Sequence, residues 1–186
     1  MSTNAALCPE PPPAPAPAPT APAPPAPGRP PARPTPGAAL HSIAAATTVL
    51  LALVAIGAML HEPVLIPPLA ASAALVQSAP TLPLAQPRSV IVGHLVGSAV
   101  GYAVLAAAGS SGWAAAVAAG LTLAVTMAAR TPHSPAVATA VIVVLQTPAP
   151  ERFVPLLFGS TVLLVLTGYA ASRIRRTAPR YPAYWW

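Results

Sequence analysis

The sequence has 186 residues, of which 55% are hydrophobic and 6% are charged. A soluble domain carries about a quarter charged residues, so this composition excludes an ordinary water-soluble surface and predicts an integral membrane protein in a lipid bilayer. The net charge of +6 comes from nine arginines and three glutamates. Nucleic-acid binding requires basic residues clustered on one face. These arginines are spread over segment ends, so we expect no nucleic-acid partner.

The first 37 residues differ in composition from the remainder. From Pro9 to Pro36 the chain is almost wholly proline and alanine. Proline has no backbone N–H to donate, so residues 1–37 are predicted to form a disordered, proline-rich arm. A spacer is the favoured interpretation, and a ligand for a proline-binding domain is the alternative. Cys8 is the one cysteine, so no internal disulfide is expected. Because Met1 to Pro9 contains no base and no apolar run, no cleaved signal is predicted.

Residues 38–176 are predicted to be a transmembrane domain. A helix needs about 20 apolar residues to span the bilayer, and four stretches reach or approach this length: Ala39–Leu60, Ser89–Gly109, Gly112–Ala129 and Phe153–Ser172. Two shorter stretches, 64–79 and 135–147, begin at prolines and are predicted to be half-helices or broken spans. The fold class is therefore an all-α membrane protein with about six transmembrane or half-membrane helices. Residues 177–186 form an aromatic tail, whose Tyr181, Tyr184, Trp185 and Trp186 are expected at the membrane interface.

The two halves of this domain carry similar signals in the same order. His61-Glu62-Pro63 precedes the first short segment and His133-Ser134-Pro135 begins the second, while Gly101-Tyr102 and Gly168-Tyr169 lie in the following helices. Three segments per half would make the second half inverted, as in many transporters. Chance alignment of alanine-rich sequence is the alternative.

Arginine placement favours one topology. Basic residues flanking spans favour the cytoplasm. Six crossings from a cytoplasmic start put Arg88, Arg130 and the group Arg173, Arg175, Arg176 and Arg180 inside, and Arg152 outside. Four crossings with two re-entrant segments are the alternative. We expect both termini in the cytoplasm.

Three motifs resemble the HPP family of integral membrane proteins. Residues 83–94 (PLAQPRSVIVGH) are similar to the family segment PLAQPRNVIGGH, and residues 68–75 (PLAASAAL) to its PFGASAVL run. Residues 132–140 (PHSPAVATA) stand where the family has HPPAGATAL, with Ser134 in place of a proline and Val137 in place of a glycine. The resemblance covers roughly Ala39 to Arg176. It implies a membrane fold and, because some members are linked to nitrite transport, a transport function.

Candidate site residues come from the broken segments and from the family-like motif. They are Ser72, Gln86, Arg88, His94, His133, Ser134 and Thr139. Helix N-termini can hold small anions through free backbone amides. We therefore expect the amides of residues 69–72 and 136–138 to face each other around an anion, with two kinked packing helices as the alternative. An intramembrane histidine such as His94 needs a partner, and an interhelical hydrogen bond is favoured over a pore-lining or proton-carrying role.

The predicted function is a permease or channel for a small solute, such as an inorganic anion like nitrite. The alternative is a membrane scaffold that uses its proline-rich arm. No aspartate or lysine is present, and the three glutamates and four histidines show no catalytic or metal-ligand spacing. We therefore expect no enzyme, no cofactor and no metal. Arginine-only, alanine-rich usage indicates a bacterial inner membrane, and a bundle of this size suggests a homo-oligomer.

Overall fold

The computed structural model describes residues 32–174 and 179–185. Most of the predicted arm, together with Arg175, Arg176 and Trp186, lies outside these residues. The chain divides into two units, Met1–Arg33 and Pro34–Trp186. Everything below concerns the second unit.

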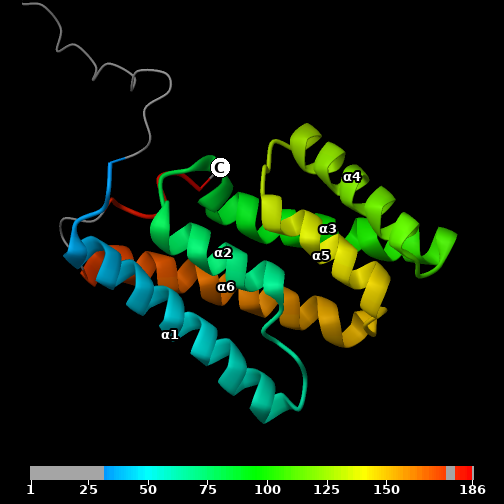
Figure 1. Cartoon of the computed structure of the whole chain (residues 1–186), viewed down its shortest axis with the longest axis horizontal. Helices are drawn as coiled ribbons and strands as arrows, with labels where there is room; N and C mark the ends of the chain where they lie inside the picture. Colours follow the sequence, from blue (N-terminus) through cyan, green and yellow to red (C-terminus); the bar gives the residue numbers. More distant parts are fainter. Residues whose placement is uncertain (1–31, 175–178, 186) are drawn as a thin grey trace, which may run out of the picture. The chain divides into compact units, whose positions relative to one another are not determined.

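The described residues of this unit form six α-helices and one short 3-10 helix (Figure 1). They are α1 (Pro36–Leu60), α2 (Pro67–Ser78), η1 (Pro83–Ala85), α3 (Pro87–Ala108), α4 (Gly112–Ala128), α5 (Ser134–Gln146) and α6 (Pro150–Ile174). The all-α prediction is confirmed. Helices α1, α3 and α6 are long and apolar enough to cross a membrane, and α4 and α5 are shorter apolar helices.

Proline marks where most of these helices begin. Helices α1, α2, α3 and α5 carry it in their first two positions, where its missing N–H would have no partner in the helix. Helix α1 begins at Pro36, within the stretch assigned to the arm, because Thr35 caps it by accepting a hydrogen bond from the Ala38 amide at 3.3 Å. It ends at His61, which adopts a left-handed conformation with φ of 56°.

The outer surface of the bundle is apolar, and polar side chains gather inside. Large apolar side chains are exposed on α1, α4 and α6, among them Leu51, Met59, Trp113, Met127 and Ile174. The buried polar side chains include serines, threonines, glutamines and two histidines. Such an inside-out distribution is the one a hydrocarbon solvent requires. The fold is that of a multi-pass membrane protein.

The two short helices run from one end of the bundle to the other. Residues before α2 meet the start of α6, where Arg152 pairs with Glu62 at 2.8 Å. Residues after α2 meet the end of α6, because the ring of Tyr181, which bonds Ala85, packs on Gly168. Helix α5 starts beside Leu84 at the head of α3 and ends near Tyr102, whose hydroxyl donates to the Pro148 carbonyl. Each short segment thus crosses the bundle, and α2 and α5 are antiparallel.

Helix packing follows a two-fold pattern. Helix α1 contacts α2 and α6, and α4 contacts α5 and α3. Helix α2 contacts α6 as α5 contacts α3, while α2 with α5 and α3 with α6 form the two central pairs. Exchanging α1 with α4, α2 with α5 and α3 with α6 leaves this set of helix pairs unchanged. Figure 1 accordingly shows α1 and α4 at opposite edges of the bundle.

Individual contacts follow the same exchange at a constant separation of 67 positions in the sequence. A Cβ on Gly101 would press on Val143, and a Cβ on Gly168 would press on Val76. The equivalent contact partners, Val76 and Val143, are 67 positions apart, as are the two glycines. These matching contacts support the predicted inverted repeat of three helices.

The repeat corrects one sequence alignment. His61 was aligned with His133 because both precede a proline. His133 is the N-cap of α5, and the N-cap of α2 is Ile66. His61 instead ends α1 and is exposed. Both histidines come two residues before a proline, and this similarity suggested the alignment. Five residues separate His61 from α2, whereas His133 directly precedes α5.

Candidate functional site

Four of the predicted site residues meet at the centre of the bundle. We call them the histidine hub: Ser72 on α2, His94 on α3, and His133 and Thr139 on α5 and its N-cap. Ser72, His94 and Thr139 are fully buried, and His133 is 2% exposed. In the middle of a membrane bundle, buried polar side chains must satisfy one another.

The hub is joined by short hydrogen bonds. Ser72 Oγ lies 2.8 Å from His94 Nε2 and 2.9 Å from His133 Nε2. His94 Nδ1 lies 2.7 Å from the hydroxyl of Thr139. The two imidazole rings are arranged edge to face, with their centroids 4.9 Å apart. Three helices are therefore tied together through four side chains.

Glycines on α3 allow this close approach. Gly93, Gly97 and Gly101 form a smooth face of α3, and it packs against α5 and its N-cap. A Cβ on Gly97 would collide with the carbonyl of Ala136, and one on Gly93 would collide with His133. The contact places His94, next to Gly93 in the sequence, among the residues of α5.

His133 is held from its other ring nitrogen. Its Nδ1 donates to the carbonyl of Leu84 at 2.8 Å, because a carbonyl can only accept. Leu84 belongs to η1, just before α3. This bond links the start of α5 to the start of α3 and fixes the orientation of the imidazole ring.

The hub lies across the two repeats. Ser72 and Thr139 are equivalent at the separation of 67 positions, and each hydroxyl lies near the carbonyl of the proline four residues before it. His94 bridges them, with one ring nitrogen toward each hydroxyl. Its own equivalent on α6 is Thr161, whose hydroxyl donates to Phe158 of the same helix at 2.8 Å. The two repeats therefore differ at this position, because His94 joins two helices through its hydrogen bonds and Thr161 bonds only within its own helix.

The structure does not bring the other three predicted residues into the hub. The Gln86 side chain is buried and donates to the carbonyls of Pro80 and Leu82, both at 2.9 Å. Arg88 donates to the carbonyl of Ala129 at 3.0 Å, and Ser134 is exposed. Through these hydrogen bonds Gln86 stabilises the loop between α2 and η1, and Arg88 contacts the end of α4.

The prediction that the N-termini of the two short helices, α2 and α5, face each other is wrong. Because α2 and α5 are antiparallel, their starts point to opposite ends of the bundle. The first amides are also engaged: Leu69 N–H donates to Ile66 at 3.0 Å and Ala136 N–H donates to His133 at 3.0 Å. Pro67 and Pro68 have no N–H to offer. Side chains, and not backbone amides, make the polar centre.

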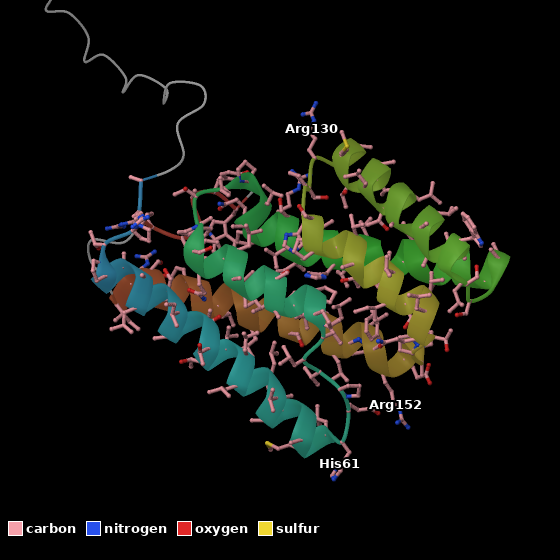
Figure 2. The ribbon with its side chains drawn as sticks, in the orientation of Figure 1. His61, Arg130 and Arg152 are labelled. Carbon is pink, nitrogen blue, oxygen red and sulfur yellow. The ribbon has the colours of Figure 1, made fainter. Side chains whose placement is uncertain are left out.

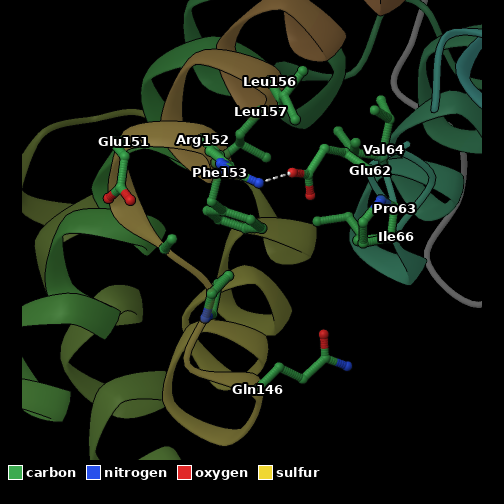
Figure 3. Close-up of a pocket in the computed structure, with 13 residues that line it drawn as sticks. Glu62, Pro63, Val64, Ile66, Gln146, Glu151, Arg152, Phe153, Leu156 and Leu157 are labelled. Carbon is green, nitrogen blue, oxygen red and sulfur yellow. Dashed lines mark hydrogen bonds and ion pairs between the residues drawn. The ribbon is translucent and has the colours of Figure 1, made fainter. Parts of the chain in front are cut away.

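A cavity of about 450 Å³ opens at the end of the bundle where α2 begins (Figure 3). Arg152 donates to the Glu62 carboxylate at 2.8 Å on its wall, and Phe153 and Leu157 line its apolar side. Leu69, which also lines it, is less than one helical turn before Ser72. The cavity therefore approaches the hub from this end. Figure 2 shows Arg152 and His61 near this end and Arg130 far from both.

The opposite end is covered by the C-terminal tail. Tyr181 is fully buried, and its hydroxyl donates to the carbonyl of Ala85 at 2.9 Å. Gln86 Oε1 accepts a hydrogen bond from the Ala183 amide at 2.9 Å. Ala85 and Gln86 lie 67 positions before Arg152 and Phe153. The tail thus covers the residues equivalent to part of the cavity wall.

This tail corrects the interfacial prediction for Tyr181, which packs on α6 and η1. Burial raises the pKa of its phenol above the ordinary value. Tyr184 and Trp185 are exposed. Sequence reasoning also missed that Arg152 pairs with Glu62 and not with the adjacent Glu151, because no local signal relates residues 90 positions apart.

Comparisons with known proteins agree with this architecture. A model of the transmembrane region of HPP proteins matches residues 31–182. Two curated transmembrane proteins of Dictyostelium discoideum are each 34% identical, over 132 and 128 residues, or 66% and 63% of this chain. These matches cover 46% and 40% of the relatives, so the chain spans less than half of their length. No solved structure matches. Because the model of the HPP transmembrane region matches residues 31–182, most of this chain, the chain belongs to the HPP family of integral membrane proteins.

Proposed function

We propose that this protein is a permease for a small solute and that its substrate is an inorganic anion such as nitrite. The observation that carries the proposal is the histidine hub, buried where two short antiparallel helices cross. Ionisable residues inside a membrane bundle are costly and usually mark a transport pathway. In transporters built from inverted repeats, the substrate site lies near the midplane at the repeat interface.

The difference between the two ends also supports transport. The cavity beside Arg152 and Phe153 is open, and the equivalent residues at the other end, Ala85 and Gln86, are bonded by the tail. Inverted-repeat transporters expose a central site to one side at a time. The tail contacts of Ala85 and Gln86 fit one state of such a cycle, and a cavity of about 580 Å³ between α1, α2 and α6 lies beside the tail at the same end.

We further propose that both termini face the cytoplasm of a bacterial cell. Arg88, Arg130 and Arg173 lie toward the end of the bundle where α1 begins and α6 ends, and Arg152 lies at the other end, paired with Glu62. An excess of arginine on the cytoplasmic side is the usual orientation signal. Arg152 would by itself favour the opposite orientation, but its charge is paired with the Glu62 carboxylate.

Anion flux into liposomes containing the purified protein tests this function. Nitrite, nitrate, formate and chloride should be compared, and we expect flux of at least one of them above that of empty liposomes. The substitution Ser72→Ala removes the hydroxyl that joins both histidines. A lost buried hydrogen-bond partner costs about 1–3 kcal/mol, so flux should fall by roughly tenfold or more.

A matched control is Thr122→Val. Thr122 is also fully buried, but its hydroxyl donates to Ala118 within its own helix at 2.8 Å. This variant should keep wild-type flux. If no anion is carried by folded protein, the permease proposal is wrong. The scaffold alternative would then be tested by deleting residues 1–33, which removes the arm and keeps the Thr35 cap of α1. This deletion should abolish scaffold function.

A further inference from the structure

The protons of the histidine hub can be assigned by counting donors and acceptors. A hydroxyl has one proton to donate, and a neutral imidazole has one N–H and one lone pair. Because His133 Nδ1 donates to the Leu84 carbonyl, its Nε2 carries the lone pair. Ser72, 2.9 Å away, must then donate its only proton to His133. If Ser72 donated to the Pro68 carbonyl instead, the lone pairs of Ser72 Oγ and His133 Nε2 would face each other.

The same count fixes the other half of the hub. The Ser72 oxygen can only accept from His94, so His94 Nε2 carries its proton at 2.8 Å. His94 Nδ1 therefore carries the lone pair and accepts from Thr139 at 2.7 Å. The neutral chain runs in one direction, from Thr139 through His94 and Ser72 to His133. It requires the two histidines to be opposite tautomers, His94 protonated at Nε2 and His133 at Nδ1.

From this arrangement we infer that the hub is a one-proton binding site that makes the permease proton-coupled, an inference that rests on the proposed transport function. Two hydroxyls and two imidazoles in a continuous hydrogen-bonded chain can pass a proton by successive hops. No carboxylate is needed for this. The ligand is a proton taken from water on one side. After the site has opened to the other side, the proton returns to water by the reverse of the same hops, because the Leu84 carbonyl beside His133 Nδ1 does not take it up.

The transfer balances at every atom. A hydronium ion gives a proton to the Thr139 oxygen and leaves as water, while Thr139 passes its original proton to His94 Nδ1. His94 passes its Nε2 proton to Ser72, and Ser72 passes its own proton to His133 Nε2. Each oxygen again holds one proton, and His133 is an imidazolium. The hydroxyl of Thr139 then points to the Pro135 carbonyl, 3.4 Å away.

The surroundings limit the hub to one added proton. A second would place two positive rings with centroids 4.9 Å apart, which a low-dielectric interior disfavours. Helices α2, α4 and α5 carry no other titratable side chain. On α3 the charged or titratable groups are Arg88 and Tyr102, which donate to Ala129 and Pro148.

On α6 and the described tail, the remaining charged or titratable groups are Glu151, Arg152, Tyr169, Arg173, Arg180, Tyr181 and Tyr184. The hydrogen bonds described for the hub include none of them, so the added charge has no neutralising carboxylate there. An anionic substrate could supply that neutralisation. Anion and proton would then cross together, with the net charge moved reduced to zero.

Tautomer measurement tests the proton site without reference to transport. Solid-state NMR of 15N-histidine-labelled protein in lipid gives separate signals for protonated and bare ring nitrogens. His61→Asn, with a left-handed backbone that asparagine tolerates, and His41→Asn assign the two signals outside the hub. We expect opposite tautomers for His94 and His133 near neutral pH, and one new imidazolium on lowering the pH from about 8 to about 4.

Two variants sharpen this measurement. Ser72→Ala should disturb the tautomer of His94 and leave that of His133, because His94 Nε2–H loses its acceptor while His133 Nδ1 still donates to Leu84. Ser72→Thr should restore the pattern by keeping a hydroxyl. Identical tautomers in the wild type, or a pattern unchanged by Ser72→Ala, would overturn the proton site. Protonation of both histidines in the folded protein would overturn the one-proton limit.

Proton movement in liposomes then separates this inference from the proposed function. With a nitrite gradient as the driving force, a pH dye inside liposomes should report acidification that accompanies nitrite entry. Nitrite flux without any protein-dependent pH change would overturn proton coupling and leave the permease intact. Opposite tautomers and a one-proton titration with no anion flux would support the proton site and overturn the permease.

Discussion

At the scale of single residues, Tyr181 links the tail to the helices. Its ring packs against Gly168 of α6, where a Cβ would contact the ring, and its hydroxyl donates to Ala85 at 2.9 Å. Buried tyrosines usually pair their hydroxyl in this way. One side chain thus joins the end of the chain to the start of α3.

Replacing Tyr181 with phenylalanine tests this link and its pH dependence. The lost hydrogen bond should lower the free energy of unfolding by about 1 kcal/mol near neutral pH. Burial raises the pKa of the Tyr181 phenol, so the folded protein binds the phenolic proton more tightly than the unfolded chain. That stabilisation is complete below about pH 10, the unfolded value, and decreases as the pH rises above it.

Thermal unfolding in detergent, measured from pH 8 to about pH 11, checks the Tyr181 prediction. The wild type should lose stability over the upper part of this range, and Tyr181→Phe should lose less. Tyr184→Phe is the control, because Tyr184 is 45% exposed. An equal alkaline loss in the wild type and in Tyr181→Phe would contradict the assignment.

The identities of the hub residues could be predicted from the sequence, but their contacts could not. Ser72, His133 and Thr139 were selected because they lie at the starts of the two short segments, and His94 because an intramembrane histidine needs a partner. Which of them meet depends on how α2, α3 and α5 pack. The same limit explains Tyr181, because the preference of aromatic rings for the interface does not include a tail that folds back onto its own bundle.

At the scale of helices, α2 and α5 are unusual because they cross the bundle with few residues. Helix α2 has 12 residues and α5 has 13, or about 18–20 Å at 1.5 Å per residue, against a hydrocarbon core of about 30 Å. The missing length is supplied by two segments outside the α-helices, residues 62–66 before α2 and residues 79–86, which include η1, after it. Such irregular backbone is tolerated only where protein surrounds it.

Cysteine labelling tests whether α2 crosses the membrane or re-enters it. In a Cys8→Ser background, His61→Cys and Thr81→Cys place single thiols at exposed positions before and after α2. A membrane-impermeant maleimide added to sealed, uniformly oriented vesicles should label one variant and reach the other only after permeabilisation. Labelling of both from the same side would contradict a crossing. Wild-type flux of each variant controls for folding.

The number of helices was predictable from the sequence, whereas the ends of the short helices were less so. Apolar length and flanking prolines located the spans, since the bilayer imposes a fixed length. The sequence placed the first short segment at 64–79, and α2 begins at Pro67. Pro63 and Pro67 were equally good helix starts by local preference. The extended residues up to Ile66 are set by packing in the cluster that includes Val64, Ile66 and Leu69.

At the scale of the whole domain, the two repeats interlock. Helix α3 of the first repeat packs on α4 and α5 of the second, and α6 of the second packs on α1 and α2 of the first. The third helix of each repeat therefore completes the other repeat. Neither repeat has a complete core alone, because Gly97 and Gly101 of α3 and Gly168 of α6 all find their partners across the boundary.

Splitting the chain between the repeats tests this interlocking. The break belongs at Ser110, in the exposed turn between α3 and α4, where few contacts would be lost. Fragments 1–109 and 110–186 expressed separately should be degraded or aggregate, because each exposes the glycine faces that its partner covers. Expressed together, they should assemble and co-purify through a tag on one fragment.

Gly97→Leu should abolish that assembly, since even a Cβ at this position meets the Ala136 backbone. Gly120→Leu is the matched control, because no atom lies within 4 Å of its Cβ position. If each fragment alone were stable and monomeric, the repeats would be independent modules, and the hub could not depend on their interlocked packing.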